Sequence, residues 1–328
     1  MENQEERRKY KYEMKPALEA RLRKLLPDET DFREFEKVIH TGPRSFIRCN
    51  TLKISPQELF ERLNKKWKVV QPFTDHKEIM LVEQNLLPGE LGNSIEHLLG
   101  YYYIQEIVSM LPPLALDPQP GEFVLDLFAS PGSKTTQMAA KMKNQGTLIA
   151  NDLKIDRIRI LASNLEKSGA TNIIVTRNDA VNFCQKLEKT NFKFDKILCD
   201  APCSGEGTIR SSPKTLIMWN EKVIKNFGRQ QRKFIACAIK LLKKGGTLVY
   251  STCTHAPEEN ESVVDFVLKN FPVKIETLSL PIVCRSGITE WEGDSFSQEV
   301  KKACRIYPHD NDSEGFFLAK FTLLEEIE

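Results

Sequence analysis

The chain has 328 residues, 41% of them hydrophobic, and its 47 Lys and Arg against 45 Asp and Glu leave a net charge of +2. This length allows one large domain and a small one with a sizeable core. A near-neutral charge argues against indiscriminate coating of nucleic acid, but leaves room for a local basic face. The sequence shows no signal peptide, no Cys-x-x-Cys pair and no membrane-spanning run. We therefore expect eight free thiols, no structural zinc and a monomeric, cytoplasmic protein.

Residues 1–92 predict a small α+β domain. Residues 1–40 carry apolar side chains at the spacing of short amphipathic helices. A strand-like run over 43–53 precedes a helix over 56–64, with strands near 67–70 and 79–82. Within the following connector, residues 101–110 alternate polar and aromatic side chains, and we predict a helix there that docks on the second domain.

Residues 93–328 alternate strands and helices, which indicates an α/β domain with a parallel sheet. Predicted strands begin at Phe123 and cover 147–152, 172–176, 194–200 and 247–251, with two last strands at 274–278 and 316–324. One predicted helix starts near Lys134, and the others cover residues 154–168, 221–242 and 257–270. Gly245 and Gly246 are predicted to stop the helix over residues 221–242.

The stretch from Phe123 to Thr136 reads as a buried strand, a tight loop and the start of a helix. It lacks the glycine spacing of a P-loop and the Gly-x-Gly-x-x-Gly of a dinucleotide fold. An acidic strand end followed by a turn of small residues suits a ligand with hydroxyls and a cationic centre. An ordinary strand-to-helix turn is the alternative.

Four predicted strands end in or near an aspartate, namely Asp126, Asp152, Asp179 and Asp200. In open α/β sheets ligands bind at the carboxyl ends of the strands. Asp152 is placed to accept hydrogen bonds from a ribose, and Asp179 could meet an adenine amino group. S-adenosylmethionine combines a ribose, an adenine and a sulfonium cation. The alternative is that each aspartate caps the following helix.

Two cysteines follow neighbouring strand ends, Cys203 after the fourth strand and Cys253 after the fifth, so both thiols are expected in one cleft. Cys199, inside a strand, is typical of a buried structural thiol. A thiolate that adds to C6 of cytosine makes C5 nucleophilic enough to take a methyl group. Lys134 would favour the thiolate. These residues alone leave open which cysteine attacks.

The segments Asp-Leu-Phe-Ala-Ser-Pro-Gly-Ser-Lys-Thr at 126–135, Asp-Ala-Pro-Cys-Ser-Gly-Glu-Gly-Thr at 200–208 and Tyr-Ser-Thr-Cys-Thr at 250–254 occur in this order, with Pro-Glu-Glu-Asn-Glu at 257–261. Together they resemble the RNA 5-methylcytosine methyltransferases of the Nop/Sun (Fmu) family, from Arg44 to Lys320. The resemblance implies a Rossmann-like class I methyltransferase sheet, mostly parallel with an antiparallel last strand, beside an RNA-binding-like domain. It also implies S-adenosyl-L-methionine as cofactor and RNA as substrate. The compact form is most similar to archaeal tRNA-modifying members, with ribosomal RNA as the alternative substrate.

The resemblance also implies roles for individual residues. Cys253 would be the nucleophile, Cys203 would help resolve the covalent intermediate, Asp200 would hold the cytosine edge near the cofactor, and Lys134 would support the catalytic geometry. Asp152 would bind the ribose, Asp179 would lie near the adenine and Arg157 would steady the pocket. The loop that surrounds the methionine part of S-adenosylmethionine would comprise Phe128, Ala129, Ser130, Pro131, Gly132, Ser133 and Lys134. Ser130 departs from the alanine of many members, which leaves the cofactor assignment intact.

The target cytosine must be unpaired or flipped for its ring to be reached. Basic side chains offer either an RNA track or ordinary solvation; they are Arg44, Arg48, Lys53 and Lys68 near the N-terminus, and Lys222, Lys225, Arg229, Arg232 and Lys233 on the long helix. Two rival functions are a DNA cytosine methyltransferase, with Cys203 as nucleophile, and a catalytically silent RNA-binding protein. The presence of both cysteines counts against the second.

Overall fold

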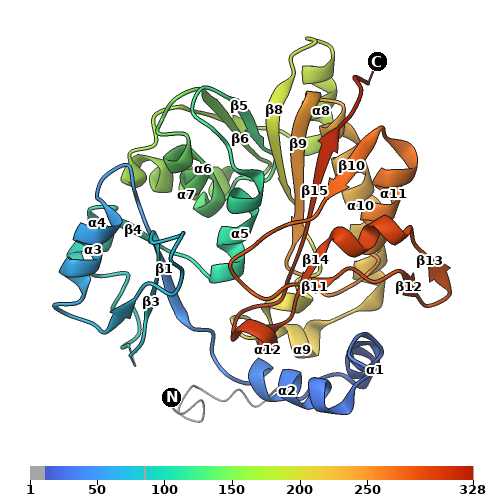
Figure 1. Cartoon of the computed structure of the whole chain (residues 1–328), viewed down its shortest axis with the longest axis horizontal. Coiled ribbons are helices and arrows are strands. Elements are labelled where there is room, and N and C mark those ends of the chain that lie inside the picture. Colours follow the sequence, from blue (N-terminus) through green and yellow to red (C-terminus); the bar gives the residue numbers. More distant parts are fainter. Residues whose placement is uncertain (1–11, 85, 328) are drawn as a thin grey trace.

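The computed structural model describes residues 12–84 and 86–327, and its first two helices pack against the large C-terminal part of the chain (Figure 1). They are α1 (Pro16–Leu25) and α2 (Glu29–Ile39), and the Asp28 side chain caps α2 by accepting a hydrogen bond from the Asp31 amide. Their apolar faces share one buried cluster with side chains as distant as Ile224 and Tyr307. The amphipathic pattern of residues 1–40 is thus confirmed from residue 16 onward, while residues 1–11 lie outside the described part.

A small antiparallel sheet follows, in the strand order β2-β3-β1-β4. Its elements are β1 (Ser45–Cys49), α3 (Pro56–Leu63), β2 (Val69–Val70), β3 (Ile79–Val82), α4 (Ile95–Leu98) and β4 (Tyr102–Ile104). The helix predicted over residues 101–110 is wrong for its first part, because Tyr102–Ile104 pair with β1 as a strand, and is confirmed from Ile107 onward, where the helix α5 (Ile107–Leu116) begins. Consecutive aromatic and β-branched side chains favour a strand there, and the buried Tyr102 hydroxyl donates to the Leu91 carbonyl. This sheet continues beyond residue 92, so we propose that the module ends after Ile104.

The large sheet has the strand order β11-β14-β15-β9-β8-β5-β6-β7, and β10 also pairs with β15. The strands from β5 to β9 run parallel, and β15 runs antiparallel to β9, as expected for the last strand. Strand order reverses on either side of β5, the position where α/β folds place their ligands. The bounds are β5 (Phe123–Asp126), β6 (Thr147–Asp152), β7 (Ile173–Arg177), β8 (Phe194–Asp200), β9 (Leu242–Thr252), β10 (Val273–Glu276), β11 (Arg285–Ser286), β14 (Cys304–Ile306) and β15 (Phe316–Leu323).

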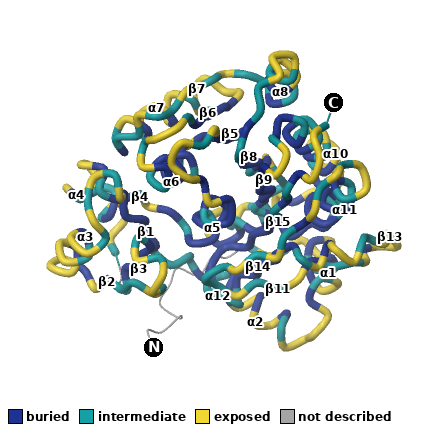
Figure 2. Tube along the Cα trace, turned by 45° about the horizontal axis from the view of Figure 1, so that its top comes forward, coloured by how far each residue is buried: buried dark blue, intermediate teal, exposed yellow. Residues whose placement is uncertain are grey.

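Helices cover both faces of this sheet, so its central strands are buried on both sides (Figure 2). Because side chains alternate along a strand, Val124 contributes to the cluster under α5 and α6, whereas Leu125 contributes to the cluster under α8, α10 and α11. The helices are α5 (Ile107–Leu116), α6 (Ser133–Lys141), α7 (Ile155–Ser168), α8 (Ala180–Glu188), α10 (Glu221–Ile239) and α11 (Glu261–Asn270). Shorter elements are η2 (Glu206–Thr208), α9 (Thr215–Met218), β12 (Glu290–Trp291), β13 (Asp294–Ser295), η3 (Gln298–Lys302) and α12 (Pro308–Asn311).

Two predicted helix boundaries are wrong. The long helix α10 ends at Ile239, and Gly245 and Gly246 lie inside β9, where the pairing with β8 shifts register, instead of stopping the helix. Helix α11 begins at Glu261 and not at 257. The Asn260 side chain joins Thr252 and Thr254 by hydrogen bonds, which holds the preceding turn in a non-helical conformation.

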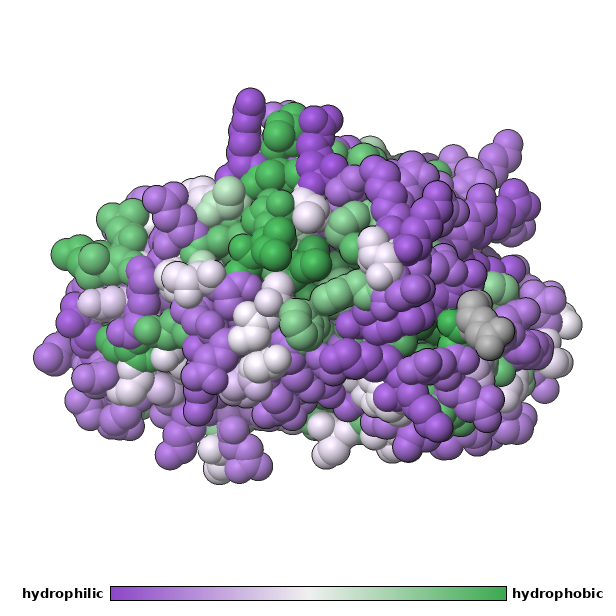
Figure 3. All heavy atoms as spheres, turned by 90° about the horizontal axis from the view of Figure 1, so that it is seen from above, coloured by the Kyte–Doolittle hydropathy of each residue, from purple (hydrophilic) through white to green (hydrophobic). Residues whose placement is uncertain are grey.

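The molecular surface combines charged side chains with an apolar band. Figure 3 shows hydrophobic side chains gathered on the face seen from above. Strand β7 ends the large sheet on one side and keeps Ile174 and Val175 exposed. None of the helices in the described residues is both long enough and apolar enough to cross a membrane.

Candidate active site

The loop after β5 is held rigidly by contacts with β6 and α7. The Ala129 amide donates to the Asn151 carbonyl at 2.8 Å, and the Ser130 hydroxyl donates to the Arg157 carbonyl at 2.7 Å. Gly132 has φ +104°, and a Cβ there would lie 3.0 Å from Leu161 Cδ1, so the turn requires glycine. Helix α6 therefore starts at a defined distance from the ends of the parallel strands.

Asp126, the first of the strand-end acids, supports this loop from beneath. Its carboxylate accepts a hydrogen bond from the Thr135 hydroxyl at 2.7 Å. Burial raises the pKa of Asp126 to about 7, and the charge of Asp200 adds to the rise. Because Asp126 is buried and engaged by α6, we assign it to the framework of the site.

A cavity of about 440 Å³, here called the strand-end cavity, lies over the ends of β5, β6 and β8. Its lining includes Phe128, Ser130, Asp152, Arg157, Asp179, Asp200, Cys203, Phe234 and Cys253. The Asp152 carboxylate accepts hydrogen bonds from the amides of Ser130 and Lys154 and from the Arg157 guanidinium, at 3.2 to 3.3 Å. These donors hold the carboxylate in place at the cavity wall.

Asp179 confirms its interpretation as a helix cap, while its contact with an adenine stays a prediction. Its side chain caps α8 by accepting a hydrogen bond from the Asn182 amide at 3.0 Å, and it also lines the strand-end cavity. Across the cavity wall, the rings of Phe128 and Phe234 meet edge to face, with centroids 4.9 Å apart. The cavity thus combines aromatic walls with fixed carboxylates.

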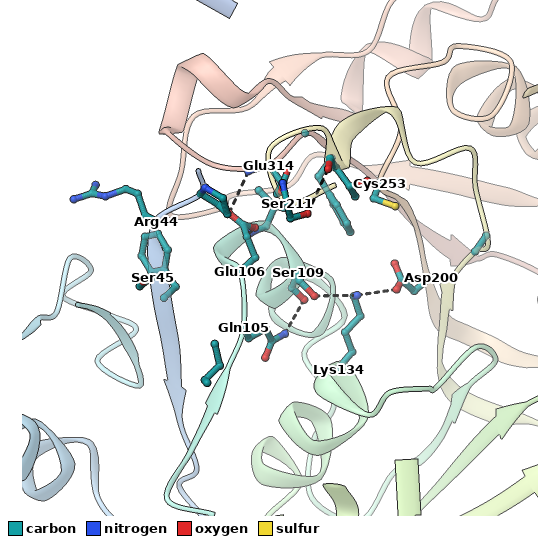
Figure 4. A pocket seen from close by; sticks show the side chains of 18 residues that line it. Arg44, Ser45, Gln105, Glu106, Ser109, Lys134, Asp200, Ser211, Cys253 and Glu314 are labelled. Carbon is teal, nitrogen blue, oxygen red and sulfur yellow. Dashed lines mark hydrogen bonds and ion pairs between the residues drawn. The ribbon is translucent and has the colours of Figure 1, made fainter. Parts of the chain in front are cut away.

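A second cavity of about 500 Å³ lies between the small module and the catalytic part, and we call it the interdomain cavity (Figure 4). Asp200, Ala201 and Cys253 line both cavities, which therefore meet at the ends of β8 and β9. Lys134 reaches into this junction, with its Nζ 2.7 Å from Asp200 Oδ2 and 3.1 Å from the Ser109 hydroxyl.

The Lys134 and Asp200 pair carries its charges in a largely buried position. Burial opposes the charged form of Lys134, but the ion pair and hydrogen bond with Asp200 outweigh it, so the pKa of Lys134 is raised above its usual value. The other Asp200 oxygen accepts a hydrogen bond from the Ser251 hydroxyl at 2.6 Å. The pair therefore offers a fixed hydrogen-bond donor beside a fixed acceptor.

The two motif cysteines lie side by side, with 3.0 Å between Cys203 Sγ and Cys253 Sγ. The hydrogen bond with Cys253, together with burial, raises the pKa of Cys203 well above its usual value. Cys253 lines both cavities, whereas Cys203 lines the strand-end cavity. The expectation that both thiols share one cleft is confirmed by this contact.

Backbone hydrogen bonds join the loop of Cys253 to two other segments of the chain. The Gly207 amide donates to the Cys253 carbonyl at 2.9 Å, and the Gly315 amide donates to the Gly207 carbonyl at 2.8 Å. A Cβ on Gly315 would lie 2.3 Å from the His255 ring and 2.9 Å from the Gly207 Cα, so the close approach requires glycine. His255 is buried, which lowers its pKa to about 3, and it stacks on Tyr307 as a neutral ring.

Comparison with protein families agrees with this geometry. Residues 113–322 match the family model described as 16S rRNA methyltransferase RsmB/F, and residues 15–107 match the N-terminal domain of 16S rRNA methyltransferase RsmF. The chain belongs to the RsmB/F methyltransferase family. The Nop/Sun resemblance of the motifs is thereby confirmed, and so is the class I methyltransferase fold.

Proteins similar to this chain are named for different RNA substrates. A tRNA (cytosine(49)-C(5))-methyltransferase of Pyrococcus abyssi is 43% identical over 88% of this chain and 91% of its own length. The ribosomal RNA small subunit methyltransferase F of Vibrio cholerae is 38% identical over 94% of this chain, but the match spans 63% of that protein. Crystal structures of a methyltransferase homologue and of NSun6, both from Pyrococcus horikoshii, superpose with TM-scores of 0.78 and 0.79 at 35% and 26% identity. They cover 95% of this chain and 100% and 98% of their own.

The structure corrects part of the predicted basic surface. Arg48 is buried, and its guanidinium donates to the Ser133 carbonyl at 2.6 Å and to the Thr136 hydroxyl at 2.8 Å, so it joins the small module to α6 and lies away from solvent. Burial lowers the pKa of Arg48 to about 10. Lys53 donates to the carbonyls of Leu99 and Lys167.

Several residues of the site were absent from the sequence prediction. In the predicted cofactor loop, Phe128 and Ser130 line the strand-end cavity and Lys134 lines the interdomain cavity, while the other members line neither of these two cavities. Ser109, Glu106 and Glu314 line the interdomain cavity without having been predicted. The sequence signal for Glu314 was its position beside the Gly315-Phe316 pair that closes the family resemblance.

Proposed function

We propose that this chain is an S-adenosylmethionine-dependent RNA cytosine-C5 methyltransferase that acts on tRNA through a covalent adduct between Cys253 and C6 of cytosine. The observation that carries the proposal is the contact of Cys203 and Cys253 at the junction of two cavities. One cavity has the chemistry for a cofactor and the other for a base. The family membership of the chain supports the same reaction.

The strand-end cavity fits the cofactor. Asp152 offers a held carboxylate for ribose hydroxyls, and Asp179 lies on the same wall. Phe128 and Phe234 provide apolar faces for an adenine or for the methionine chain, and Arg157 steadies Asp152. S-adenosylmethionine, when bound, supplies a methyl group on a cationic sulfur. The carboxylate of Asp200, shared by both cavities, suits a nearby cation.

The interdomain cavity fits the target ring. Asp200 can accept a hydrogen bond from the cytosine amino group, while Lys134 can donate to the ring nitrogen or oxygen beside it. Cys253 lines this cavity and is therefore the better placed thiol for attack on the base. Its Sγ would form a bond to C6, and the ring electrons that this displaces make C5 nucleophilic toward the methyl group.

Cys203 is suited to the second half of the reaction. Its raised pKa results first from the hydrogen bond with Cys253. Once Cys253 Sγ is bonded to C6, this contact is replaced and the main cause of the raised pKa is gone. Cys203, after losing its own proton to water, can then take the proton from C5; the electrons of that C–H bond re-form the C5–C6 double bond, the C6–Sγ bond breaks, and the Cys253 thiolate leaves as the methylated base is released.

The small module offers the route for RNA. Its residues Arg44, Ser45, Phe46 and Ile104 line the interdomain cavity, and Figure 4 shows Arg44 and Ser45 across it from Cys253. Arg44 makes ion pairs of 3.5 Å to Glu83 and 3.8 Å to Asp312, longer than hydrogen bonds, so its N–H groups can serve a phosphate. Ribosomal RNA is the second candidate substrate, favoured by the similarity to the Vibrio cholerae protein.

We also propose that the protein works as a monomer in the cytoplasm, where its eight free cysteines stay reduced. The function is tested by incubating the purified protein and labelled S-adenosylmethionine separately with tRNA transcripts, small-subunit rRNA transcripts and DNA. Bisulfite sequencing then locates the modified cytosine. The expected result is a single 5-methylcytosine in tRNA. Methylation confined to rRNA would make rRNA the substrate in place of tRNA. Methylation of DNA alone would support the rival function as a DNA methyltransferase, with Cys203 as the nucleophile. If no methyl group is transferred to any of the three, the proposed enzymatic activity is refuted.

A further inference from the structure

One side of the interdomain cavity holds two acidic side chains that the proposed reaction leaves unused, Glu106 and Glu314 (Figure 4). Glu106, the cap of α5, has both oxygens engaged, with the Val108 amide donating at 2.7 Å and the Glu314 amide at 3.2 Å. Burial raises the pKa of Glu106 to about 7. Glu106 therefore anchors the backbone of Glu314.

Glu314 differs from Glu106 in having an oxygen to spare. It is 5% exposed, and its Oε1 accepts a hydrogen bond from the Ser211 amide at 2.7 Å. Its Oε2 is buried and accepts no hydrogen bond from any described residue. A buried carboxylate oxygen without a donor is costly, and burial raises the pKa of Glu314 accordingly. Because Glu314 lines the interdomain cavity, a ligand that fills this cavity can bring the missing donor once the side chain turns toward it.

The position of Glu314 is fixed relative to the nucleophile. Gly315, the next residue, donates to the Gly207 carbonyl, and Gly207 donates to the Cys253 carbonyl. These backbone hydrogen bonds connect the Glu314 segment to the Cys253 loop. The distance between the Glu314 carboxylate and a base bound at Cys253 is therefore fixed. The target ring already has an acceptor and a donor in Asp200 and Lys134, and Glu314 lies on the side of the cavity nearer to Arg44 (Figure 4).

We propose that Glu314 is a specificity-determining residue, whose Oε2 accepts a hydrogen bond from an amino group or a 2′-hydroxyl of the nucleotide adjoining the target cytosine. This inference rests on the proposed function as an RNA methyltransferase. A carboxylate accepts from such neutral donors and repels phosphate, so the backbone of that nucleotide is directed to the side of Arg44. Glu106 and Ser211 act as positioning residues that aim the free oxygen.

The substitution Glu314→Gln tests the acceptor with little change in shape. The amide oxygen of the glutamine can still accept a hydrogen bond from the Ser211 amide. The amide nitrogen takes the place of Oε2, so its N–H group would face the hydrogen-bond donor of the nucleotide instead of accepting from it. We expect kcat/KM for tRNA to fall about tenfold or more, the effect of losing a buried hydrogen bond to a charged group. The dissociation constant for S-adenosylmethionine should stay unchanged, because Glu314 does not line the strand-end cavity. Glu299→Gln is the matched control, because the Glu299 side chain on η3 is exposed.

Synthetic RNA separates the two sources of the donor. The RNA stem that carries the methylated cytosine is made with single 2′-deoxy or des-amino nucleotides on either side of the target. One of these removals should slow the wild-type protein and leave Glu314→Gln unaffected, and it identifies the donor. If every removal costs both proteins equally, or if Glu314→Gln keeps wild-type kcat/KM, the inference is overturned while RNA methylation by the wild-type protein still stands. If Glu314→Gln loses cofactor affinity, Glu314→Asp is measured in the same way and judged by the same outcomes.

Discussion

Replacing Lys134 by methionine should destabilise the fold as well as stop methyl transfer, because it leaves Asp200 without its cation. The two side chains are 13% and 24% exposed, and Nζ lies 2.7 Å from the carboxylate. Removing one partner of a buried ion pair costs about 3–5 kcal/mol. Ser251 still donates a hydrogen bond to Asp200 in this variant, and the carboxylate is still partly in contact with solvent. We therefore expect the loss of unfolding free energy to lie at the lower end of this range, at about 3 kcal/mol.

Urea unfolding of Lys134→Met, Asp200→Asn and the double variant measures this directly. The double variant has no unpaired charge, so its loss of unfolding free energy should be smaller than the sum of the single losses by about 2 kcal/mol. Lys141→Met is the matched control, because its pair with Asp117 is exposed and worth about 1 kcal/mol or less. A Lys134→Met protein within 1 kcal/mol of wild type, or a strictly additive double variant, would refute the reasoning.

Three further predictions concern the cofactor, pH and RNA. Asp152→Asn should weaken S-adenosylmethionine binding about tenfold or more in calorimetry, and unchanged affinity would remove Asp152 from the pocket. The pKa of Asp126 is raised to about 7 from 3.8, so its contribution to stability is complete below about pH 4 and is lost as pH rises to about 7. Asp126→Asn should flatten the decline in unfolding free energy over that range, and an identical decline would contradict this. Arg229→Glu with Lys233→Glu should lower RNA affinity and its salt slope while sparing the cofactor, and an unaltered slope would assign that face to solvent.

Local chemistry made the centre of the site predictable from the sequence. Apolar runs that end in an aspartate mark the strands, and a loop cysteine at each of two neighbouring strand ends needs only strand adjacency to bring the thiols together. Both features depend on a few consecutive residues. Cys203 and Cys253 therefore meet as expected, although 50 residues separate them.

Features set by long-range packing were not predictable in this way. Glu314 and Glu106 are 208 residues apart, and neither has a local pattern that distinguishes it from a surface acid. Arg48 looks like a surface cation in the sequence, yet acceptors on α6 satisfy it in the interior. The strand at Tyr102–Ile104 is decided by its pairing with β1, and the predicted helix therefore begins only at Ile107.

The most direct test of the central claim is a denaturing gel of protein incubated with its RNA and S-adenosylmethionine. Cys203→Ala should trap a covalent protein–RNA band, because methylation proceeds but release fails, and Cys253→Ala should form no such band and no 5-methylcytosine. A trapped band with Cys253→Ala, or full turnover by that variant, would contradict the assignment of Cys253 as the attacking thiol.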